Sequence, residues 1–591
     1  MRINFRFEEL GLKLANGKKV LQGVTGAVSA GKMTAIMGPS GAGKTTAMNV
    51  LMGKVARTGG RLFINDQEEE MQKFRKIIGY VPQEDIMLRE LTVRENVLHA
   101  ARIKVPASWS ATDVEAFVDD ILAALNLSHV AHSPIGDENT RGVSGGQRKR
   151  VNIAMELAGI PLALFLDEPT SGLDSTAALD VAEIMSQLTT LGLTIVAVIH
   201  QPRIEIFEKF DDVLMIAPGG RTAYLGPAKA AKGYFQDLGF EFDVNYNAAD
   251  ILMDILSGKG VNRERNFTVD DLVAEWETRR AASSPTPTST STSTSTSDPF
   301  LTHSRSLLAT RGAPFLRQLL YCHNRYVTQQ QRAIGTMFLE LFVAVFAGSL
   351  IGYALNGEEM FVGLWKEPYS RVGPSPEDET VSLYGMLTGL AVALSGAPAA
   401  VNVFSNEKPV FWRETASGHS RVAYYLGKTI AATYRVALSA LHFTAIYYVL
   451  AKPLVGFGMQ YLILLGMFFG VYGMSAAIST LVLRENAALL SVVIAMFAAV
   501  FCGYGPSITD AKNGGFLFVL QMSFNKWAAE AQYSESLTPY GQVYDIEFSR
   551  ERYGYAIDDV TVDLSICFAI GVVWRVIAFV LLVITHRDKQ N

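Results

Sequence analysis

Cysteine and charge are both scarce in this chain of 591 residues, and each scarcity narrows the possible classes of protein. The three cysteines fall before or within long apolar runs, so no extracellular disulfide framework is expected. Charged residues make up 18% of the chain, and the net charge of −5 gives no sign of a nucleic-acid partner. No cleavable signal peptide is visible either, because the chain opens with a strand-like segment, residues 2–7.

Charged residues are scarcest in the second half of the chain. Up to about residue 257, short apolar runs alternate with polar helices and glycine-rich turns, a pattern typical of a soluble α/β domain. After Gln331, long runs have the roughly 20 apolar residues that a membrane span needs, and they mostly lack the polar face of a soluble core helix. The six predicted spans are Ala333–Leu355, Val381–Phe404, Thr429–Leu450, Tyr461–Leu483, Ala487–Gly505 and Leu564–Thr585.

Three parts of the chain follow from these patterns. We expect an α/β domain over residues 1–260, a linker over 261–305, and an all-α six-helix transmembrane domain over 306–591. The linker contains a Ser/Thr-rich tract, residues 283–297, whose composition is typical of a flexible tether or, alternatively, of a glycosylated stalk. Basic residues cluster in alternate short loops, and the positive-inside rule then places both termini in the cytosol, which disfavours the stalk.

One glycine-rich segment predicts a phosphate site. It lies between an apolar strand and a helix start, which is the context that a phosphate-binding loop requires. Its backbone N–H groups and the helix N-terminus favour an anion, Lys44 is placed to reach the β- and γ-phosphates, and the Thr45 hydroxyl is placed to ligate Mg²⁺. The predicted loop is Gly38, Pro39, Ser40, Gly41, Ala42, Gly43, Lys44, Thr45 and Thr46.

A carboxylate pair, Asp167-Glu168, ends the apolar run 162–166, which reads as a buried parallel strand. At the carboxyl end of such a strand, Asp167 can hold Mg²⁺ through water, and Glu168 can act as general base toward the attacking water. A solvated turn is the alternative for an isolated Asp-Glu. His200 follows another apolar strand, where a histidine is often structural, and Gln83 lies in a Val-Pro-Gln phrase that is weak by itself.

Together with the segment Ser144, Gly145, Gly146 and Gln147, these elements resemble the ATP-binding cassette of ABC transporters. The resemblance implies that His200 contacts the γ-phosphate, that Gln83 links Mg²⁺ to the membrane domain, and that Asp174 is part of the site. It also implies that the Ser144 loop closes over the ATP held by a second cassette. The family's adenine-stacking aromatic is missing near Leu12, where Phe5 or Phe7 could substitute or could be buried by strand alternation.

The cassette precedes the spans, and several phrases resemble the ABCG (White-type) half-transporters, especially the branch with GQRKR in the signature. These phrases are Val143–Val151, Ile199–Pro202, Asn247–Asp250 and Phe404–Glu414. The family implies a homodimer or heterodimer with another half-transporter, in a membrane and with two composite ATP sites. It implies export or flipping of an amphipathic or lipid-like hydrophobic substrate, at the plasma membrane rather than an internal one. The alternative is an ATP-gated regulator or channel.

The same resemblance assigns roles outside the cassette. Ser405–Arg421 is the expected coupling element between cassette and spans, and Met496, Phe497 and Phe501 are candidates for lining the substrate path, with lipid as the alternative neighbour. Ionisable residues inside spans are costly. Glu340 and Arg435 lie near span ends, where snorkelling or a boundary error explains them, and Arg575 is expected to make a structural pairing rather than contact substrate.

Overall fold

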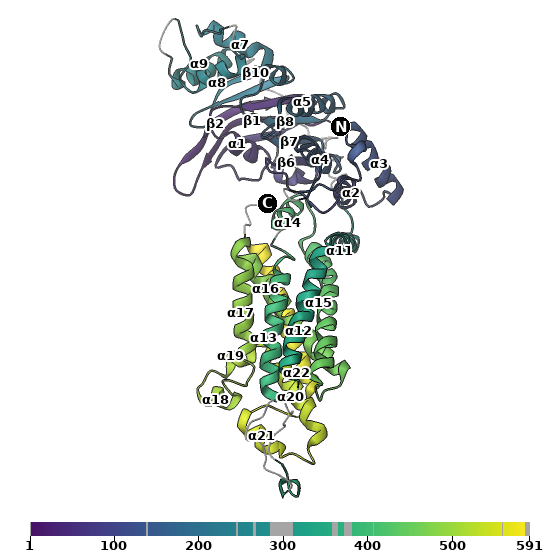
Figure 1. Cartoon of the computed structure of the whole chain (residues 1–591). Coiled ribbons are helices and arrows are strands. Elements are labelled where there is room, and N and C mark those ends of the chain that lie inside the picture. The colour runs from purple at the N-terminus through teal and green to yellow at the C-terminus, as the bar shows by residue number, and fades with distance from the viewer. Residues whose placement is uncertain are drawn as a thin grey trace, which may run out of the picture. The chain divides into compact units, whose positions relative to one another are not determined.

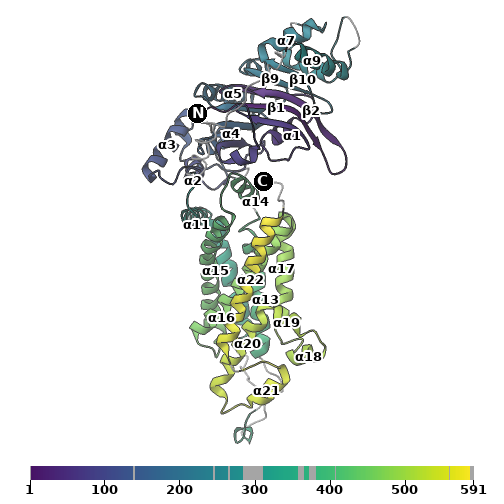
Figure 2. The same ribbon diagram turned by 180° about the vertical axis from the view of Figure 1, so that it is seen from behind.

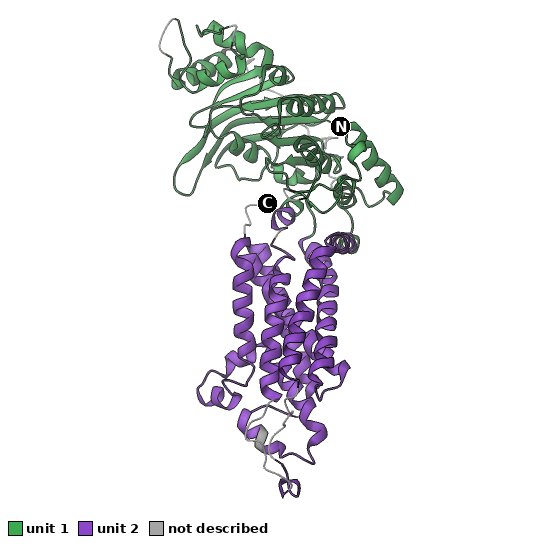
Figure 3. Cartoon of the chain, in the orientation of Figure 1, with its two compact units in different colours: residues 1–318, 413–420, 591 green, residues 319–412, 421–590 purple. Residues whose placement is uncertain are grey.

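The structure is a computed structural model, and it divides the chain into two compact units (Figure 3). The N-terminal unit holds residues up to Gln318 together with Arg413–Ser420, and the helical unit holds Leu319–Trp412 and Arg421–Gln590. The described residues are 2–137, 140–243, 246–263, 267–283, 311–356, 365–371, 381–405, 407–557 and 559–585. The Ser/Thr-rich tract beyond residue 283, and with it most of the expected linker, lies outside them.

Two sheets form the centre of the N-terminal unit, a four-stranded sheet in the order β2-β1-β4-β5 and a six-stranded sheet in the order β10-β9-β3-β8-β7-β6. Strands β9, β3, β8, β7 and β6 run parallel, and β10 joins β9 antiparallel. The strands are β1 (Phe5–Lys13), β2 (Lys19–Val28), β3 (Met33–Met37), β4 (Gly59–Ile64), β5 (Gln67–Glu68), β6 (Ile78–Val81), β7 (Ala163–Asp167), β8 (Thr194–Val198), β9 (Asp212–Ala217) and β10 (Arg221–Pro227).

Helices pack on both faces of the six-stranded sheet (Figures 1 and 2), and its central strands β3, β7 and β8 are buried throughout and mostly apolar. The helices of this unit are α1 (Lys44–Leu51), α2 (Val93–Lys104), α3 (Ala111–Ala124), α4 (Gly145–Leu157), α5 (Ser175–Thr190), α6 (Ile204–Phe207), α7 (Ala228–Asp237), α8 (Ala248–Leu256) and α9 (Val269–Ser283). In β7, Leu164 and Leu166 pack into the core that α2, α4 and α5 share, whereas Phe165 packs toward α1 and the four-stranded sheet. Successive side chains of β7 point to opposite faces of the sheet, so this one strand contributes to two hydrophobic cores.

Long apolar helices dominate the helical unit, as the sequence predicts. Four of the described helices are long and apolar enough to cross a membrane: α12 (Ile334–Ala354), α13 (Val381–Val401), α16 (Phe457–Leu481) and α22 (Val560–Ile584). The third and fifth predicted spans coincide with α15 (Arg421–Ala451) and α17 (Arg484–Val500). Because α15 carries Lys428 and Arg435 and α17 has 17 residues, the count of six spans stays a prediction.

The described residues of this part of the chain form further helices. They are α11 (Phe315–Arg332), which runs from one unit into the other, α14 (Lys408–Ala416), α18 (Ile508–Asn513), α19 (Leu517–Met522), α20 (Phe524–Leu537) and α21 (Ile546–Tyr553). In the helical unit, α12 packs on α15, and α16 packs on α22.

Glycines set how closely these helix pairs approach. A Cβ on Gly348 of α12 would come within 2.9 Å of the Phe443 carbonyl oxygen on α15. On the other pair, a Cβ on Gly473 of α16 would come within 2.7 Å of the Gly571 carbonyl oxygen on α22. In lipid, the hydrophobic effect does not drive helices together. Small residues instead let the helix backbones approach closely, and this close packing favours association. The small residues of these helices therefore serve packing.

Candidate functional site

The phosphate loop folds as a tight turn between β3 and α1, and its glycines carry conformations that other residues avoid. Gly41 and Gly43 have φ values of 77° and 95°. A Cβ on Gly38 would lie 2.2 Å from the Ile216 carbonyl oxygen, so no side chain fits there. The turn ends at Gly43, the N-cap of α1. Lys44 is the first residue of this helix, so it lies at the loop together with the N–H groups of the helix N-terminus.

Lys44 is held across this loop. Its ammonium donates to the carbonyl oxygens of Gly38 at 2.8 Å and Pro39 at 3.1 Å. The side chain is buried, at 7% exposure, and burial lowers the pKa of Lys44, while the nearby carboxylates of Glu168 and Asp167 act in the opposite direction. A cation in this position gains most when an anion occupies the loop, as phosphate binding requires.

The carboxyl end of β7 brings Asp167 to the same loop. The Thr45 hydroxyl donates to Asp167 Oδ1 at 3.1 Å, across 122 residues of sequence. Burial raises the pKa of Asp167 above its usual value, although the hydrogen bond from Thr45 opposes the rise. Two of the three residues that the sequence assigned to a metal, Thr45 and Asp167, thus lie side by side.

Glu168 comes next and has a left-handed backbone with a φ of 47°, uncommon for a residue that has a side chain. Its backbone N–H is held by the Val198 carbonyl oxygen on β8 at 3.1 Å. The Gln83 side-chain amide donates to Glu168 Oε2 at 2.8 Å. Gln83 therefore orients the carboxylate expected to act as general base, a contact that the sequence did not predict.

A cavity of about 760 Å³ opens in front of these groups, within the size range of ligand sites in proteins. The sequence-predicted residues that line it are Ser40, Gly41, Gly43, Lys44, Thr45, Thr46, Glu168 and His200. The predicted residues Gly38, Pro39, Ala42, Gln83 and Asp167 are not among its lining residues. Residues that sequence reasoning missed also line it; the phrase Pro169–Asp174 and the residues after His200 were the available signals. They are Val20, Thr170, Ser171, Leu173, Ser175, Ala178, Gln201, Pro202, Arg203 and Ile206.

The Ser144 loop lies elsewhere in the N-terminal unit. Ser144 caps α4, accepting from the Gln147 N–H at 3.2 Å, while Gln147 Oε1 accepts from the Ser144 N–H at 2.9 Å, a reciprocal capping box. Asp174 caps α5 in the same way, accepting from the Ala177 N–H at 2.8 Å. Neither Ser144 nor Asp174 is among the residues that line the cavity. Hydrogen bonds within one chain thus join Thr45 to Asp167 and Gln83 to Glu168, whereas Ser144 is not among the residues that line the cavity.

The aromatic residues of β1 do not line this cavity. Leu12, Phe5 and Phe7 are 5%, 2% and 0% exposed and belong to the core around β1, so neither phenylalanine replaces the missing aromatic. The other alternative, that strand alternation buries Phe5 and Phe7, therefore accounts for both side chains. Among the described residues, no phenylalanine, tyrosine or tryptophan lines the cavity, and Val20 on β2 is an apolar residue there.

Comparison with known proteins gives this arrangement a family. One family model, described as ABC transporter, matches residues 21–171, and another, described as ABC-2 type transporter, matches residues 200–340 and 297–588. The chain is 30% identical to the broad substrate specificity ATP-binding cassette transporter ABCG2 of Bos taurus, over 82% of the chain and 75% of that protein. The chain belongs to the ABCG family of ABC transporters. This confirms the family resemblance and the fold class, a P-loop cassette followed by a helical membrane domain.

Other relatives agree with this membership. The chain is 35% identical to the ABC-type transporter claG of Penicillium crustosum, over 89% of the chain and 68% of that protein. It is 31% identical to the ABC transporter G family member 25 of Oryza sativa subsp. japonica, over 96% of the chain and 57% of that protein. The chain therefore spans between about half and about two thirds of the length of these two curated relatives. ATP binding and an integral membrane location follow from membership.

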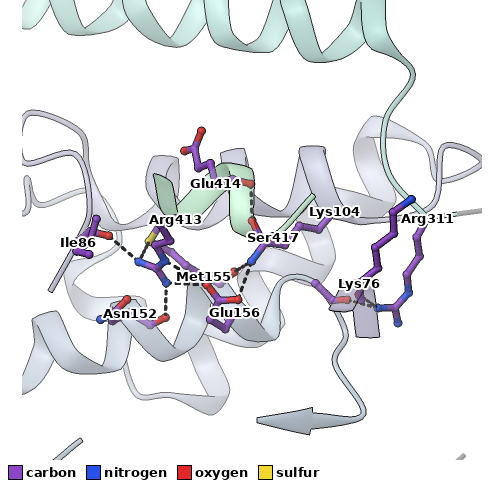
Figure 4. A network of polar contacts seen from close by, with 11 residues as sticks. Lys76, Ile86, Lys104, Asn152, Met155, Glu156, Arg311, Arg413, Glu414 and Ser417 are labelled. Atoms are coloured by element: carbon purple, nitrogen blue, oxygen red, sulfur yellow. Dashed lines mark hydrogen bonds and ion pairs between the residues drawn. The ribbon is translucent and has the colours of Figure 1, made fainter. Parts of the chain in front are cut away.

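A polar network ties the segment Arg413–Ser420 into the N-terminal unit (Figure 4). The Arg413 guanidinium donates to Glu156 Oε1 at 2.9 and 3.2 Å, and to the carbonyl oxygens of Ile86 at 2.6 Å and Asn152 at 3.2 Å. Glu156 Oε2 accepts from Lys104 at 2.8 Å. Burial opposes ionisation of Glu156, but the two cations outweigh it and lower the pKa of Glu156 to about 2. Part of the expected coupling segment is therefore anchored to α2 and α4.

In the helical unit, charged side chains inside the apolar helices have partners. Glu340 on α12 pairs with Arg435 on α15, with Nε 3.1 Å from Oε2, so a pairing and not a boundary error accounts for both. Arg575 on α22 donates to the carbonyl oxygens of Phe469 at 2.8 Å and Gly571 at 2.9 Å, and lies over the Phe469 ring. All three residues thus have partners within the helical unit, and the structural role expected for Arg575 stays a prediction.

Proposed function

We propose that this protein is a half-transporter that works as a dimer, with each ATP held between two cassettes. The single observation that carries the proposal is the separation within one chain: Lys44, Thr45 and Glu168 line the cavity, whereas Ser144 does not. A second cassette would bring its Ser144 loop over the nucleotide. The α4 N-terminus behind Ser144 would then add backbone N–H groups and positive potential at the γ-phosphate.

Hydrolysis would use the groups that β7 brings to the phosphate loop. Thr45 Oγ1, the Asp167 carboxylate and the Gln83 amide oxygen are hard oxygen donors of the kind that Mg²⁺ prefers, so the residues present fit this ion. Bound Mg²⁺ would neutralise charge on the β- and γ-phosphates. Glu168, oriented by Gln83, would take the proton from the attacking water, and His200 would contact the γ-phosphate. Asp174 would support the site by holding the start of α5.

Coupling to transport would run through Arg413–Ser420. This segment joins the second and third predicted spans in sequence, yet it clusters with the cassette through Arg413 and Glu156. Breaking a buried ion pair leaves an uncompensated charge, so such a pair resists displacement more than a surface pair does. Rearrangement of α2 and α4 during ATP turnover would therefore move this segment with the cassette.

The cargo we propose is an amphipathic or lipid-like molecule, exported or flipped across the plasma membrane, with both chain termini in the cytosol. Apolar side chains on α17 support such a path, with Phe497 64% exposed and its ring 5.6 Å from that of Phe501. Met496 is partly buried against the core of the helical unit. Dimerisation with a second half-transporter would cover this exposed surface and enclose a route for a hydrophobic molecule.

An ATP-gated regulator or channel is the second candidate. The Glu168–Gln83 hydrogen bond favours turnover, because a module that only gates has no need for an oriented general base. The deciding experiment places the protein in lipid nanodiscs and measures ATP hydrolysis against a panel of sterols, phospholipids and hydrophobic drugs. We expect one class to raise turnover in the native protein and to have no effect on Glu168→Gln. Ion conductance opened by ATP, without stimulated hydrolysis by any class, would contradict transport.

A further inference from the structure

The side chain of His129 contacts the Ser144 loop within the N-terminal unit. The Gln147 amide nitrogen lies 3.2 Å from His129 Nε2, and the two residues are 18 positions apart in the chain. Gln147 is also the residue that forms the capping box with Ser144. None of these three residues is among those that line the nucleotide cavity, so the contact has no place in the chemistry at the phosphate loop.

The hydrogen bonds of Gln147 fix which way its amide faces. Its Oε1 accepts from the Ser144 backbone N–H at 2.9 Å, and a backbone N–H can only donate. The amide NH₂ group therefore faces His129, and this group also can only donate. His129 Nε2 is then the acceptor, which requires the neutral imidazole with its proton on Nδ1.

His129 extends from a turn that is fixed on both sides. It lies in the 3₁₀ helix Ser128–Val130, which follows α3. The flanking side chains of Leu127 and Ala131 are 0% and 8% exposed and belong to the core that α4 shares. The Ala131 carbonyl oxygen accepts from the Arg94 N–H on α2 at 2.9 Å. The imidazole is itself exposed, but its backbone is anchored, so it offers an acceptor in a defined position.

The contact extends through Gln147 to Ser144. Ser144 Oγ accepts from the Gln147 backbone N–H at 3.2 Å, so the capping box uses this oxygen as an acceptor and leaves the hydroxyl hydrogen to donate elsewhere. A donor stabilises a phosphate most when its direction is set before the phosphate arrives. The Gln147 amide is held at both ends, by Ser144 and by His129, and this sets the direction of the Ser144 hydroxyl.

A contact that only stabilises the start of α4 is the plain alternative. Capping interactions contribute to helix stability whatever the helix binds. Ser144 and Gln147 complete the capping box between themselves, however, so the cap does not need a third group. The bond to His129 instead restrains the orientation of the Gln147 amide.

We propose that His129 is a positioning residue of the ATP site, which holds Gln147 and, through it, the Ser144 hydroxyl in the geometry that meets the nucleotide of a second cassette. This rests on the proposed function, because there Ser144 reaches a nucleotide only across a dimer of cassettes. His129 does not touch ATP. It raises turnover at the site that holds the Lys44 of the partner subunit, and not at the site of its own chain.

Variants of His129 in the full-length protein test the contact itself. His129→Leu removes the acceptor and should lower the maximal rate of ATP hydrolysis by about 3- to 10-fold, the effect of losing one hydrogen bond of ordinary strength. The KM for ATP should change little, because the phosphate loop is untouched. His129→Gln offers an amide oxygen as acceptor and should stay within about twofold of the native rate.

His132→Leu is the matched control, because His132 is an exposed histidine of the same segment. It should hydrolyse ATP as the native protein does. An unchanged rate in His129→Leu would overturn the proposal, and so would equal losses in His129→Leu and His132→Leu.

Mixed dimers show whether His129 acts on the ATP of the partner. Two differently tagged copies are co-expressed and purified through both tags, and one copy carries Lys44→Ala, so that only the Lys44 of the other copy supports turnover. We expect His129→Leu to lower the remaining activity when it is placed on the Lys44→Ala copy, and to leave that activity unchanged on the other copy. Equal losses from both placements would overturn the proposal, since His129 would then act on the general stability of the protein.

Ser144→Arg in the same two placements separates failure of this proposal from failure of the proposed function. If Ser144→Arg abolishes activity only on the Lys44→Ala copy, the composite site stands, and the result for His129→Leu decides the role of His129 alone. If Ser144→Arg acts only on the other copy, the proposed function fails, and the role of His129 fails with it. A melting curve on each preparation checks folding, and His129→Ala decides by the same criteria if His129→Leu does not fold.

Discussion

In the N-terminal unit, ionisable groups at the phosphate loop face an open cavity. In the helical unit, by comparison, the side chains of Glu340 and Lys526 each have an oppositely charged partner. Lys44 has only carbonyl oxygens as hydrogen-bond acceptors in this structure, and Glu168 shares one amide with Gln83. By contrast, Glu340 is paired with Arg435, and Lys526 of α20 is paired with Glu530 one turn later. Incomplete pairing at the cavity leaves bonding capacity for a nucleotide, whereas the charges of these two helical pairs are already bonded to each other.

This difference separates function from stability. Removing a charge at the cavity should stop chemistry and leave the fold, because the lost interaction exists mainly with the nucleotide. Removing a charge in the helical unit should weaken the fold, because a buried partner is left alone. Three variants test this comparison: one at the cavity, one in the helical unit, and one in the segment Arg413–Ser420.

Lys44→Ala should have the largest effect. Loss of the ammonium at the β- and γ-phosphates should lower ATP hydrolysis by at least about 100-fold, the scale for removing a group that stabilises transition-state charge. Thermal unfolding should change little. Steady-state hydrolysis and a melting curve on the same preparation check both statements, with Lys18→Ala at an exposed turn as control. Undiminished turnover would refute the site.

Glu340→Leu should have the largest effect on stability. It leaves Arg435 buried among apolar side chains without its partner, which costs about 3 to 5 kcal/mol. The double variant Glu340→Leu/Arg435→Leu removes both charges and should recover most of the loss. Thermal unfolding in nanodiscs compares the two variants with the native protein. If both single and double variants melt like the native protein, then the ion pair contributes nothing to stability.

Arg413→Ala should act on coupling and have the smallest effect. It leaves Glu156 with Lys104 alone, so the segment Arg413–Ser420 loses its ion pair to α4 while the ATP cavity stays intact. We expect basal hydrolysis near the native level and a several-fold lower stimulation by substrate. Arg413→Lys, which keeps the charge but loses the planar fork, should fall between the two. Arg263→Ala, at an exposed ion pair of the same unit, is the control, and an equal loss there would remove the specific role of Arg413.

Local patterns predicted much of this protein, because they act over a few neighbouring residues. Turn chemistry predicted the phosphate loop, and the apolar run before Asp167 predicted a buried strand, which is β7. The first predicted span agrees within one residue at each end, since Ala333–Leu355 was expected and α12 covers Ile334–Ala354, whereas α15 begins at Arg421, well before the expected Thr429. The catalytic roles of Lys44 and Glu168 stay predictions.

Contacts between distant residues could not be predicted in the same way. Arg413 and Glu156 are 257 positions apart, and nothing near either residue indicates the other. The ion pair between Glu340 and Arg435 explains why both charges lie in apolar helices, which their expected position at span ends did not. The composition of a segment shows how polar it is, but it does not identify the partner of a charged residue. Alternation along β1 left open which face Phe5 and Phe7 occupy, and tertiary packing places both in the core.

Mixed dimers test the central claim, that each ATP site needs Lys44 of one chain and Ser144 of the other. Two differently tagged copies are co-expressed and purified through both tags, and ATP hydrolysis is measured. When one copy carries Lys44→Ala and the other Ser144→Arg, composite sites leave one intact, and about half of the native activity should remain. When one copy carries both changes and its partner none, both sites are broken and activity should vanish. The reverse outcome, activity only in the second arrangement, would contradict the account, because each chain would then hydrolyse ATP with its own signature.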